Sequence, residues 1–266
     1  MQDQASKLRT MVGNKRRAHS IKIYSIVGGD NGRSKANIAI NLATRLQQMD
    51  KKVIILDADT DENRIDTMLK IEVPLSLSDV IRGEASLEDA IIICPGNVHL
   101  ISGGANLLLM EDMDSIEREK IIKSMGILGN YDILIINDGA DMSKQSLKFT
   151  EFAHEVILVT NPESEGLMDG YKIIKSISLY ELKDRINIIL NQVQDQSYGE
   201  SAYEKLSQTA SRFLDLKLKC MGFISGEMPS NKDIDKICGK ILKDISNNYY
   251  TSSLKELDDR LARLLR

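Results

Sequence analysis

Short runs of apolar residues alternate along the chain with segments whose apolar residues recur every three or four positions. The first pattern is typical of buried strands, and the second is typical of helices that bury one face. The sequence predicts strands at 21–27, 53–56, 98–101, 133–136, 156–160, 186–190 and 221–224. It predicts helices from Ile38 onward and at 116–125, 167–178 and 202–213. Strands that alternate with helices indicate an α/β fold with a mainly parallel sheet in one domain.

Both ends of the chain differ from this central pattern. Residues 1–20 combine a short helical segment with a basic stretch, and residues 246–253 are polar and precede a last helix. We therefore expect an N-terminal element at 1–20, an α/β domain at 21–245 and a C-terminal helix within 246–266. A chain of 266 residues is long enough to bury a full hydrophobic core without disulfides or metals.

Charge and composition argue against several functions. The formal net charge is −4, which speaks against nucleic acid as a partner. Cys94, Cys220 and Cys238 are scattered without metal-site spacing, so they predict neither a zinc site nor a disulfide framework. Residues 1–12 carry charges where a signal peptide needs apolar residues, and no apolar run approaches the ~20 residues of a membrane span. The expected location is the cytoplasm.

A Gly-rich turn joins the first predicted strand to the first predicted helix, which is the setting of a phosphate-binding loop. Backbone N–H groups and the helix N-terminus bind phosphate in such loops. The stretch 28–43 resembles the deviant phosphate loop of the MinD/ParA ATPases, K-G-G-V-G-K-S/T followed by N-L-A. This resemblance implies a three-layer α/β/α fold of the P-loop NTPase type. It also implies nucleotide binding by Gly29, Gly32, Ser34, Lys35 and Ala36, with Lys35 as the phosphate lysine.

Six residues depart from the family pattern: Asn31, Ser34 and Asp141 stand in place of glycines, and three others change groups that position metal and phosphate. Asp30 stands in place of the signature lysine that reaches the partner's nucleotide in a dimer, and Ala36 replaces the hydroxyl residue that ligates Mg²⁺. Asn137 replaces the acidic residue that helps to hold hydrated Mg²⁺. Because phosphoryl transfer depends on a positioned metal, we expect weak ATP binding, an incomplete Mg²⁺ site and impaired hydrolysis. The alternative is that the loop is only a strand-to-helix connection.

Other residues keep the family pattern. Asp57 and Asp59 follow the second predicted strand and match the family motif D-x-D, whose second acid positions the attacking water. Asn191 follows the strand predicted at 186–190, where the family's asparagine contacts adenine. Further short matches at 77–90, 101–104, 159–162 and 222–224 occur in the family's order, so the resemblance covers nearly the whole chain.

The N-terminal sequence narrows the resemblance to one branch of the family. Residues 3–9 match the motif DQAxxLR of the FlhG/FleN/YlxH flagellar regulators. In that branch the motif binds the SRP-type GTPase FlhF and stimulates its GTP hydrolysis. The resemblance therefore implies partner binding by Asp3, Gln4, Ala5, Leu8 and Arg9. The alternative is a tail without a partner, because chain ends are often disordered.

The predicted C-terminal helix is amphipathic. The family uses such a helix as a peripheral anchor at the inner face of the cell membrane, and ATP-driven dimerisation exposes it. The basic end at 260–266 favours anionic lipid, but three acids on the same helix weaken this interpretation. A helix docked on its own domain or on a partner is the alternative. The apolar stripe consists of Leu254, Leu257, Leu261, Leu264 and Leu265.

These features favour a regulator of flagellar number or placement that binds an FlhF-type GTPase and components of the flagellar switch, or C-ring. An active ATPase that cycles between a cytosolic monomer and a membrane-bound homodimer is the alternative. Lys35, Asp57 and Asp59 support that alternative. A ParA-like partition protein is a third hypothesis. The N-terminal motif and the lack of an evident basic strip for DNA count against it.

Overall fold

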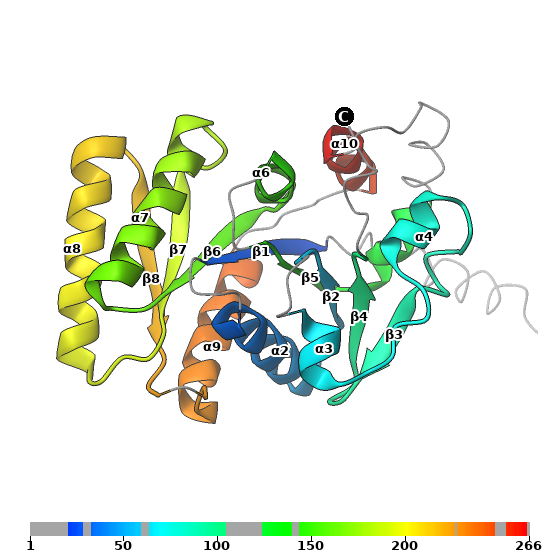
Figure 1. Cartoon of the computed structure of the whole chain (residues 1–266), viewed down its shortest axis with the longest axis horizontal. Coiled ribbons are helices and arrows are strands. Elements are labelled where there is room, and N and C mark those ends of the chain that lie inside the picture. The colour runs from blue at the N-terminus through cyan, green and yellow to red at the C-terminus, as the bar shows by residue number, and fades with distance from the viewer. Residues whose placement is uncertain are drawn as a thin grey trace, which may run out of the picture.

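The sheet at the centre of the molecule contains eight strands within the residues that the structure describes (Figure 1). The computed structural model describes residues 21–28, 33–59, 64–104, 124–139, 144–226, 228–247 and 254–264. The strand order is β3-β4-β2-β5-β1-β6-β7-β8. The strands are β1 Lys22–Gly28, β2 Val53–Asp57, β3 Ile91–Cys94, β4 Val98–Ser102, β5 Ile133–Asn137, β6 Glu155–Thr160, β7 Arg185–Leu190 and β8 Lys217–Phe223.

Neighbouring strands are parallel, except that β3 and β4 pair antiparallel at one edge. Every residue of β1, β2, β5 and β6 is buried. Helices cover both faces of these strands, so successive positions can all be apolar, and the sequence shows them as continuous runs. The predicted α/β fold with a mainly parallel sheet is confirmed.

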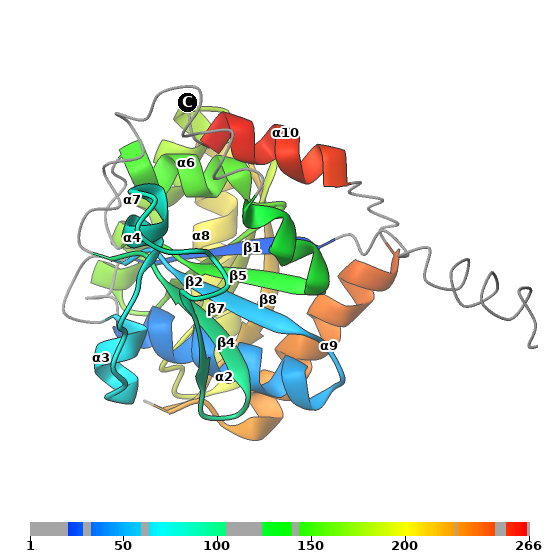
Figure 2. The same ribbon diagram turned by 90° about the vertical axis from the view of Figure 1, so that its right-hand side faces the viewer.

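The helices form two layers, one on each face of the sheet (Figure 2). α2, α3 and α9 lie on one face, and α4, α6, α7, α8 and α10 lie on the other. The three-layer architecture is therefore confirmed. None of the helices in the described ranges is long and apolar enough to cross a membrane. The helices are α2 Arg33–Gln48, α3 Ile65–Leu69, α4 Leu77–Ile81, α6 Lys144–Phe152, α7 Ser164–Leu179, α8 Gln196–Leu214, α9 Asn231–Asn247 and α10 Leu254–Leu264.

The helix α2 follows directly from the sequence pattern. Ile38, Leu42 and Leu46 are spaced four residues apart, so they lie on one face of the helix. All three are fully buried in one cluster with residues of the central strands and of α9. This packing fixes the first turn of α2 beside the carboxyl end of β1, where the predicted phosphate loop lies.

Two parts of the sheet differ from the prediction. Strand β3 was not predicted. It is joined to β4 by a tight turn in which Asn97 N donates to the carbonyl of Cys94 at 3.1 Å and Gly96 has a φ of 81°. Pro95 and Gly96 occupy the two central positions, and a Pro-Gly pair is typical of a turn whose third residue has a positive φ. Strand β8 begins at Lys217, four residues before the predicted start at Met221, because the polar residues of an edge strand interrupt the apolar run.

One predicted helix cannot be assessed in full. The prediction at 116–125 lies mostly within 105–123, outside the described residues. Met125 begins the short 3-10 helix η2, Met125–Asn130.

Candidate functional site

The carboxyl ends of β2, β5 and β1 lie side by side and form the floor of the candidate site. Asp57 ends β2 and is paired in register with Asn137, which ends β5. Asn137 in turn is in register with Ile26 of β1, two residues before the loop. In parallel α/β sheets, ligands bind at this edge. The fold therefore brings together residues that lie far apart in the sequence.

Lys35 projects from the first turn of α2 into this floor. Its side chain is fully buried, and its Nζ lies 3.0 Å from Oδ2 of Asp59. The same ammonium group donates to the backbone carbonyl of Asp138. The predicted phosphate lysine and the predicted water-positioning acid are thus direct partners.

Asn137 and Asp57 form a second buried pair. Nδ2 of Asn137 donates to Oδ1 of Asp57 at 2.7 Å, and the backbone N–H of Ile65 donates to Oδ2 at 2.6 Å. Burial raises the pKa of Asp57 to about 6, while the hydrogen bonds from Asn137 and Ile65 oppose the rise. Oδ1 of Asn137 is buried and has no hydrogen-bond partner among the described residues. A buried acceptor without a donor is costly, so this oxygen is suited to a ligand.

Asp138 is a further buried carboxyl group at this end of the sheet. Oδ2 accepts a hydrogen bond from Oγ of Ser25 at 3.2 Å, and Oδ1 accepts from the backbone N–H of Gly139 at 2.9 Å. We had assigned no role to Asp138 from the sequence. Its position directly after the β5 asparagine was the signal that could have identified it.

The residues present do not form the usual Mg²⁺ site. Ala36, in the first turn of α2, is completely buried in the core, where its methyl group offers no ligand. The amide of Asn137 directs a donor, not an acceptor, toward Asp57. No group of three or more His, Cys, Asp or Glu side chains able to hold a metal occurs within the part of the chain that the structure describes. We therefore derive no catalytic step through a metal.

Asn191 lies apart from this cluster, directly after β7. Its backbone N–H donates to the carbonyl of Thr160 at 2.8 Å, which joins the ends of β6 and β7. The residue is buried, and its Oδ1 has no hydrogen-bond partner among the described residues. This unpaired buried oxygen of Asn191 could accept a hydrogen bond from a base amino group. Another predicted nucleotide-binding residue, Ser34, is half-buried near the start of α2.

Several predicted residues lie outside the described ranges. Gly29 and Gly32 belong to the loop at 29–32, together with Asp30. The N-terminal set Asp3, Gln4, Ala5, Leu8 and Arg9 and the last leucine, Leu265, also lie outside them. Their roles stay predictions.

The C-terminal helix α10 packs on α6 on the face of the sheet that also carries α7 and α8 (Figure 2). Leu257 is 3% exposed and belongs to a core cluster with Phe149 and Phe152. Nη1 of Arg260 donates to the carbonyl of Phe152 at 3.2 Å. Leu254, Leu261 and Leu264 belong to the same helix, and the structure does not describe their side chains. At least one leucine of the predicted membrane stripe is therefore used to dock the helix on its own domain.

A second cation lies at the end of α6. Nζ of Lys183 donates to the carbonyl of Glu151 at 3.0 Å. Burial, and after it the charge of Arg260, lowers the pKa of Lys183 to about 8. Lys183 and Arg260 thus bind successive carbonyl groups that the end of a helix leaves without partners.

Comparison with known proteins agrees with this geometry. The model of the AAA domain family matches residues 21–191, more than half of the chain, and the chain therefore belongs to that family. The antiactivator FleN of Pseudomonas aeruginosa is 27% identical over 82% of this chain and 78% of its own length. The flagellum site-determining protein YlxH of Helicobacter pylori is 26% identical over 100% of this chain and 90% of its own.

The fold is shared with a solved structure of a related kind. The septum site-determining protein MinD of Pyrococcus horikoshii, complexed with Mg-ADP, superposes with a TM-score of 0.60 at 24% identity, over 92% of this chain and 95% of that chain. The predicted MinD/ParA-type membership, with flagellar regulators among the relatives, is confirmed. The deviant character of the phosphate loop stays a prediction.

Proposed function

We propose that this protein regulates flagellar number or placement as a MinD/ParA-type protein whose ATP hydrolysis is impaired. The names of FleN, an antiactivator, and YlxH, a flagellum site-determining protein, support the flagellar role. The similarity to YlxH extends over the whole chain, so it includes the N-terminal segment at 3–9. The regulator would act in the cytoplasm through protein partners.

The hydrogen bond between Asn137 and Asp57 is the observation that carries the impaired hydrolysis. An aspartate at position 137 would meet Asp57 as a like charge, and a cation would be needed to hold the two together. The neutral amide satisfies Asp57 without a metal. Ala36 removes the hydroxyl ligand at the same time. Two of the groups that would position Mg²⁺ are thus replaced by groups that do not require it.

Weak nucleotide binding is part of the proposal. Lys35, the first turn of α2 and the unpaired oxygen of Asn191 support nucleotide binding. Phosphate binding would oblige Lys35 to exchange Asp59 for a phosphate oxygen. This exchange would give up a buried ion pair, which favours weak binding. Gly29, Gly32 and Ser34 would supply backbone N–H groups.

The test is a titration with a fluorescent ATP analogue, with and without Mg²⁺, and ATP turnover measured on the same sample. We expect weak binding that is indifferent to Mg²⁺, with no turnover. The triple variant Asp30→Lys, Ala36→Thr and Asn137→Asp should gain Mg²⁺-dependent binding and turnover. The same triple variant with Lys35→Met is the matched control and should lose both. ATP turnover by the parent at the same measurable rate as by the triple variant would refute impaired hydrolysis.

Partner binding by the DQAxxLR segment is tested separately. An SRP-type GTPase of the FlhF kind should hydrolyse GTP faster in the presence of this protein. Arg9→Ala and Gln4→Ala should abolish the stimulation, because they remove the polar groups of the motif. Lys7→Ala changes a position that the motif leaves open and should retain it. Equal stimulation by all three variants would exclude the segment as the activator.

The active ATPase switch is the second candidate, because Lys35, Asp57 and Asp59 are all in place. It predicts an ATP-dependent homodimer that binds anionic vesicles through α10. Release of α10 from α6 would have to precede membrane binding, because Leu257 is buried between them. Sedimentation with vesicles, with and without ATP, decides between the two candidates. Both candidate functions would include contacts with switch components of the flagellar C-ring.

A further inference from the structure

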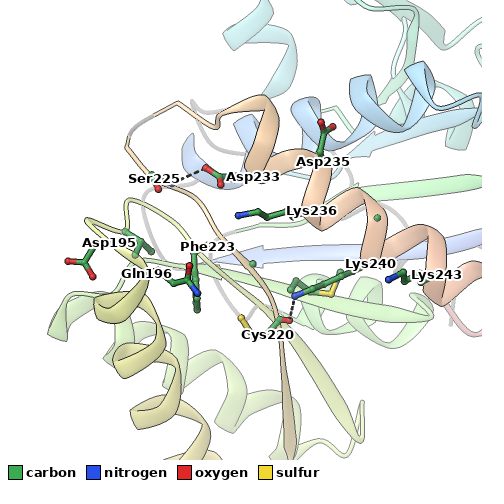
Figure 3. Close-up of a pocket in the computed structure, with 14 residues that line it drawn as sticks. Asp195, Gln196, Cys220, Phe223, Ser225, Asp233, Asp235, Lys236, Lys240 and Lys243 are labelled. Carbon is green, nitrogen blue, oxygen red and sulfur yellow. Dashed lines mark hydrogen bonds between the residues drawn. The ribbon is translucent and has the colours of Figure 1, made fainter.

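A groove runs along the outer edge of the sheet, beside β8 (Figure 3). Its volume is about 470 Å³. One wall is α9, the floor is the end of β8 from Cys220 to Phe223, and the start of α8 closes the other side. Strand β8 is separated from β1, which leads to the phosphate loop, by β6 and β7. The lining includes Val193, which follows β7, but none of the predicted nucleotide-site residues Lys35, Asp57, Asp59, Asn137 and Asn191.

Three lysines of one helix face line this groove. Lys236, Lys240 and Lys243 are spaced four and three residues apart, so they lie in a row along α9. All three are exposed. Lys236 and Lys243 have no ion-pair partner within the described part of the chain. No motif in the sequence assigns a role to this row.

The acidic residues on the same wall are already engaged. Asp235 forms an ion pair with Arg45 of α2, in which Nη2 donates to Oδ2 at 3.1 Å. Oδ2 of Asp233 accepts from Oγ of Ser230 at 2.8 Å, at the start of α9. Arg45 offsets the charge of Asp235, so the three lysines outnumber the remaining acid, Asp233, and the α9 wall carries net positive charge.

The floor of the groove is a strand edge. In the described sheet, β8 pairs with β7 on one side and is the last strand on the other. Nζ of Lys240 donates to the carbonyl of Cys220 at 3.0 Å (Figure 3). A lysine at this position is a common protection of an open strand edge, which would otherwise pair with another chain. The contact is exposed, so Lys240 can exchange the carbonyl for a carboxylate of an incoming chain.

We propose that this groove binds an acidic, extended segment of a partner protein as an additional strand beside β8. The added strand would take over the carbonyl of Cys220, and its carboxylates would pair with Lys236, Lys240 and Lys243. Strand addition of this kind obtains affinity from backbone hydrogen bonds and specificity from alternate side chains.

The alternation of a strand defines the sequence of the partner segment. Strand β8 is irregular between Cys220 and Gly222, so Met221 packs on the α9 face although Phe223, two residues further on, packs on the α8 face. An added strand without such an irregularity directs every second side chain toward α9. The segment therefore carries Asp or Glu at every second position and uncharged residues between them.

The probe is a set of fluorescein-labelled octapeptides with Glu at every second position and Val, Thr or Ser between. Saturable binding to the full chain is expected, and it should weaken as salt is added. Lys236→Glu combined with Lys243→Glu should weaken binding by at least about tenfold. Lys52→Glu combined with Lys175→Glu is the control, because it changes net charge equally at exposed sites outside the groove. It should change affinity by less than about twofold.

Backbone pairing is tested with the peptide itself. N-methylation at alternate positions removes the N–H groups from one edge of the added strand. Methylation of the odd-numbered or of the even-numbered residues affects opposite edges of the added strand. One of these two sets should abolish binding and the other should leave it intact. Binding that survives both sets, or that is lost equally in both control and groove variants, would overturn the proposal. So would absence of binding by the whole peptide set, or equal binding of a polyanion such as heparin. None of these outcomes depends on nucleotide.

Discussion

The two ends of the parallel strands hold buried ion pairs of the same chemistry in different surroundings. At the amino end, Nζ of Lys22 lies 3.3 Å from Oε1 of Glu155. Arg185 donates to Glu155 at 2.9 Å, and Asn187 donates to its other oxygen at 3.1 Å. Burial alone would raise the pKa of Glu155, but Lys22 and Arg185 outweigh it and hold the pKa below its ordinary value.

The carboxyl end has the opposite balance. Three carboxyl groups are buried at this end: that of Asp59 pairs with Lys35, that of Asp57 accepts from the amide of Asn137, and that of Asp138 accepts from Ser25. The pKa of Asp57 is raised, and an amide oxygen is left without a partner among the described residues. At the amino end Glu155 is paired with cations of the protein itself, whereas at the carboxyl end Oδ1 of Asn137 is an acceptor that a ligand could satisfy. Perturbed groups of this kind are concentrated at functional sites.

The largest expected effect separates the two ends directly. Glu155→Gln leaves Lys22 and Arg185 without a buried anion, so it should lower the free energy of unfolding by about 3 kcal/mol. Asp57→Asn removes a carboxyl group whose hydrogen-bond donors are the neutral groups of Asn137 and Ile65, so it leaves no buried cation unpaired and should cost at most about 1 kcal/mol. Urea unfolding at pH 7.5 measures both. Equal losses would mean that the carboxyl end is as much a structural network as the amino end.

The second prediction concerns α10, which docks near the amino end. Leu257→Ala should lower the free energy of unfolding by about 2 kcal/mol, because a buried leucine leaves a cavity. Leu179→Ala is the control, since Leu179 is 72% exposed, and it should change the free energy by less than about 0.5 kcal/mol. If Leu257→Ala behaved like the control, α10 would be undocked in solution, and the membrane hypothesis would gain support.

The third prediction is a pH dependence of folding stability, with a smaller effect than the two substitutions above. Nδ1 of His154, next to Glu155, accepts the backbone N–H of Ile23 at 3.0 Å, and burial lowers the pKa of His154 to about 3. The unfolded chain binds a proton below pH ~6.5, but the folded chain does not until about pH 3. Stability should therefore fall as the pH drops through this window.

A substitution isolates that contribution. His154 should lower the free energy of unfolding by about 1 kcal/mol at pH 5.5 relative to pH 7.5, allowing for its partial exposure. His154→Asn keeps an acceptor for Ile23 and should remove this part of the slope in urea titrations at several pH values. Asp57 has the opposite sign, because its raised pKa of about 6 favours folding as the pH falls from there toward 4. An unchanged slope in His154→Asn would show that other groups at the amino end carry the acid sensitivity.

The sequence predicted the elements whose signal is local. The central strands are buried on both faces and appear as continuous apolar runs, and Lys35 was identified from its spacing to the N-L-A that follows. Strand β3 was missed because its short run ends in a Pro-Gly turn, and the start of β8 was missed because Lys217 and Lys219 alternate with apolar residues.

Contacts between distant residues were beyond the sequence. Lys35 and Asp59 are 24 positions apart, and Asn137 and Asp57 are 80 apart. Nothing in either segment states that these side chains bind each other instead of a ligand. The position of Leu257 in the core likewise depends on the path of the chain after α9, which hydrophobic periodicity does not define.

The docking of α10 also sets an order of events when the chain is made. Arg260 binds the carbonyl of Phe152 across 108 residues of sequence. At a synthesis rate of about 5–20 residues per second, the end of α6 waits on the order of 5–20 s for its partner. During that interval Phe149 and Phe152 lack the cover that Leu257 later supplies. The nascent protein therefore passes through a period in which this part of its core is open to water.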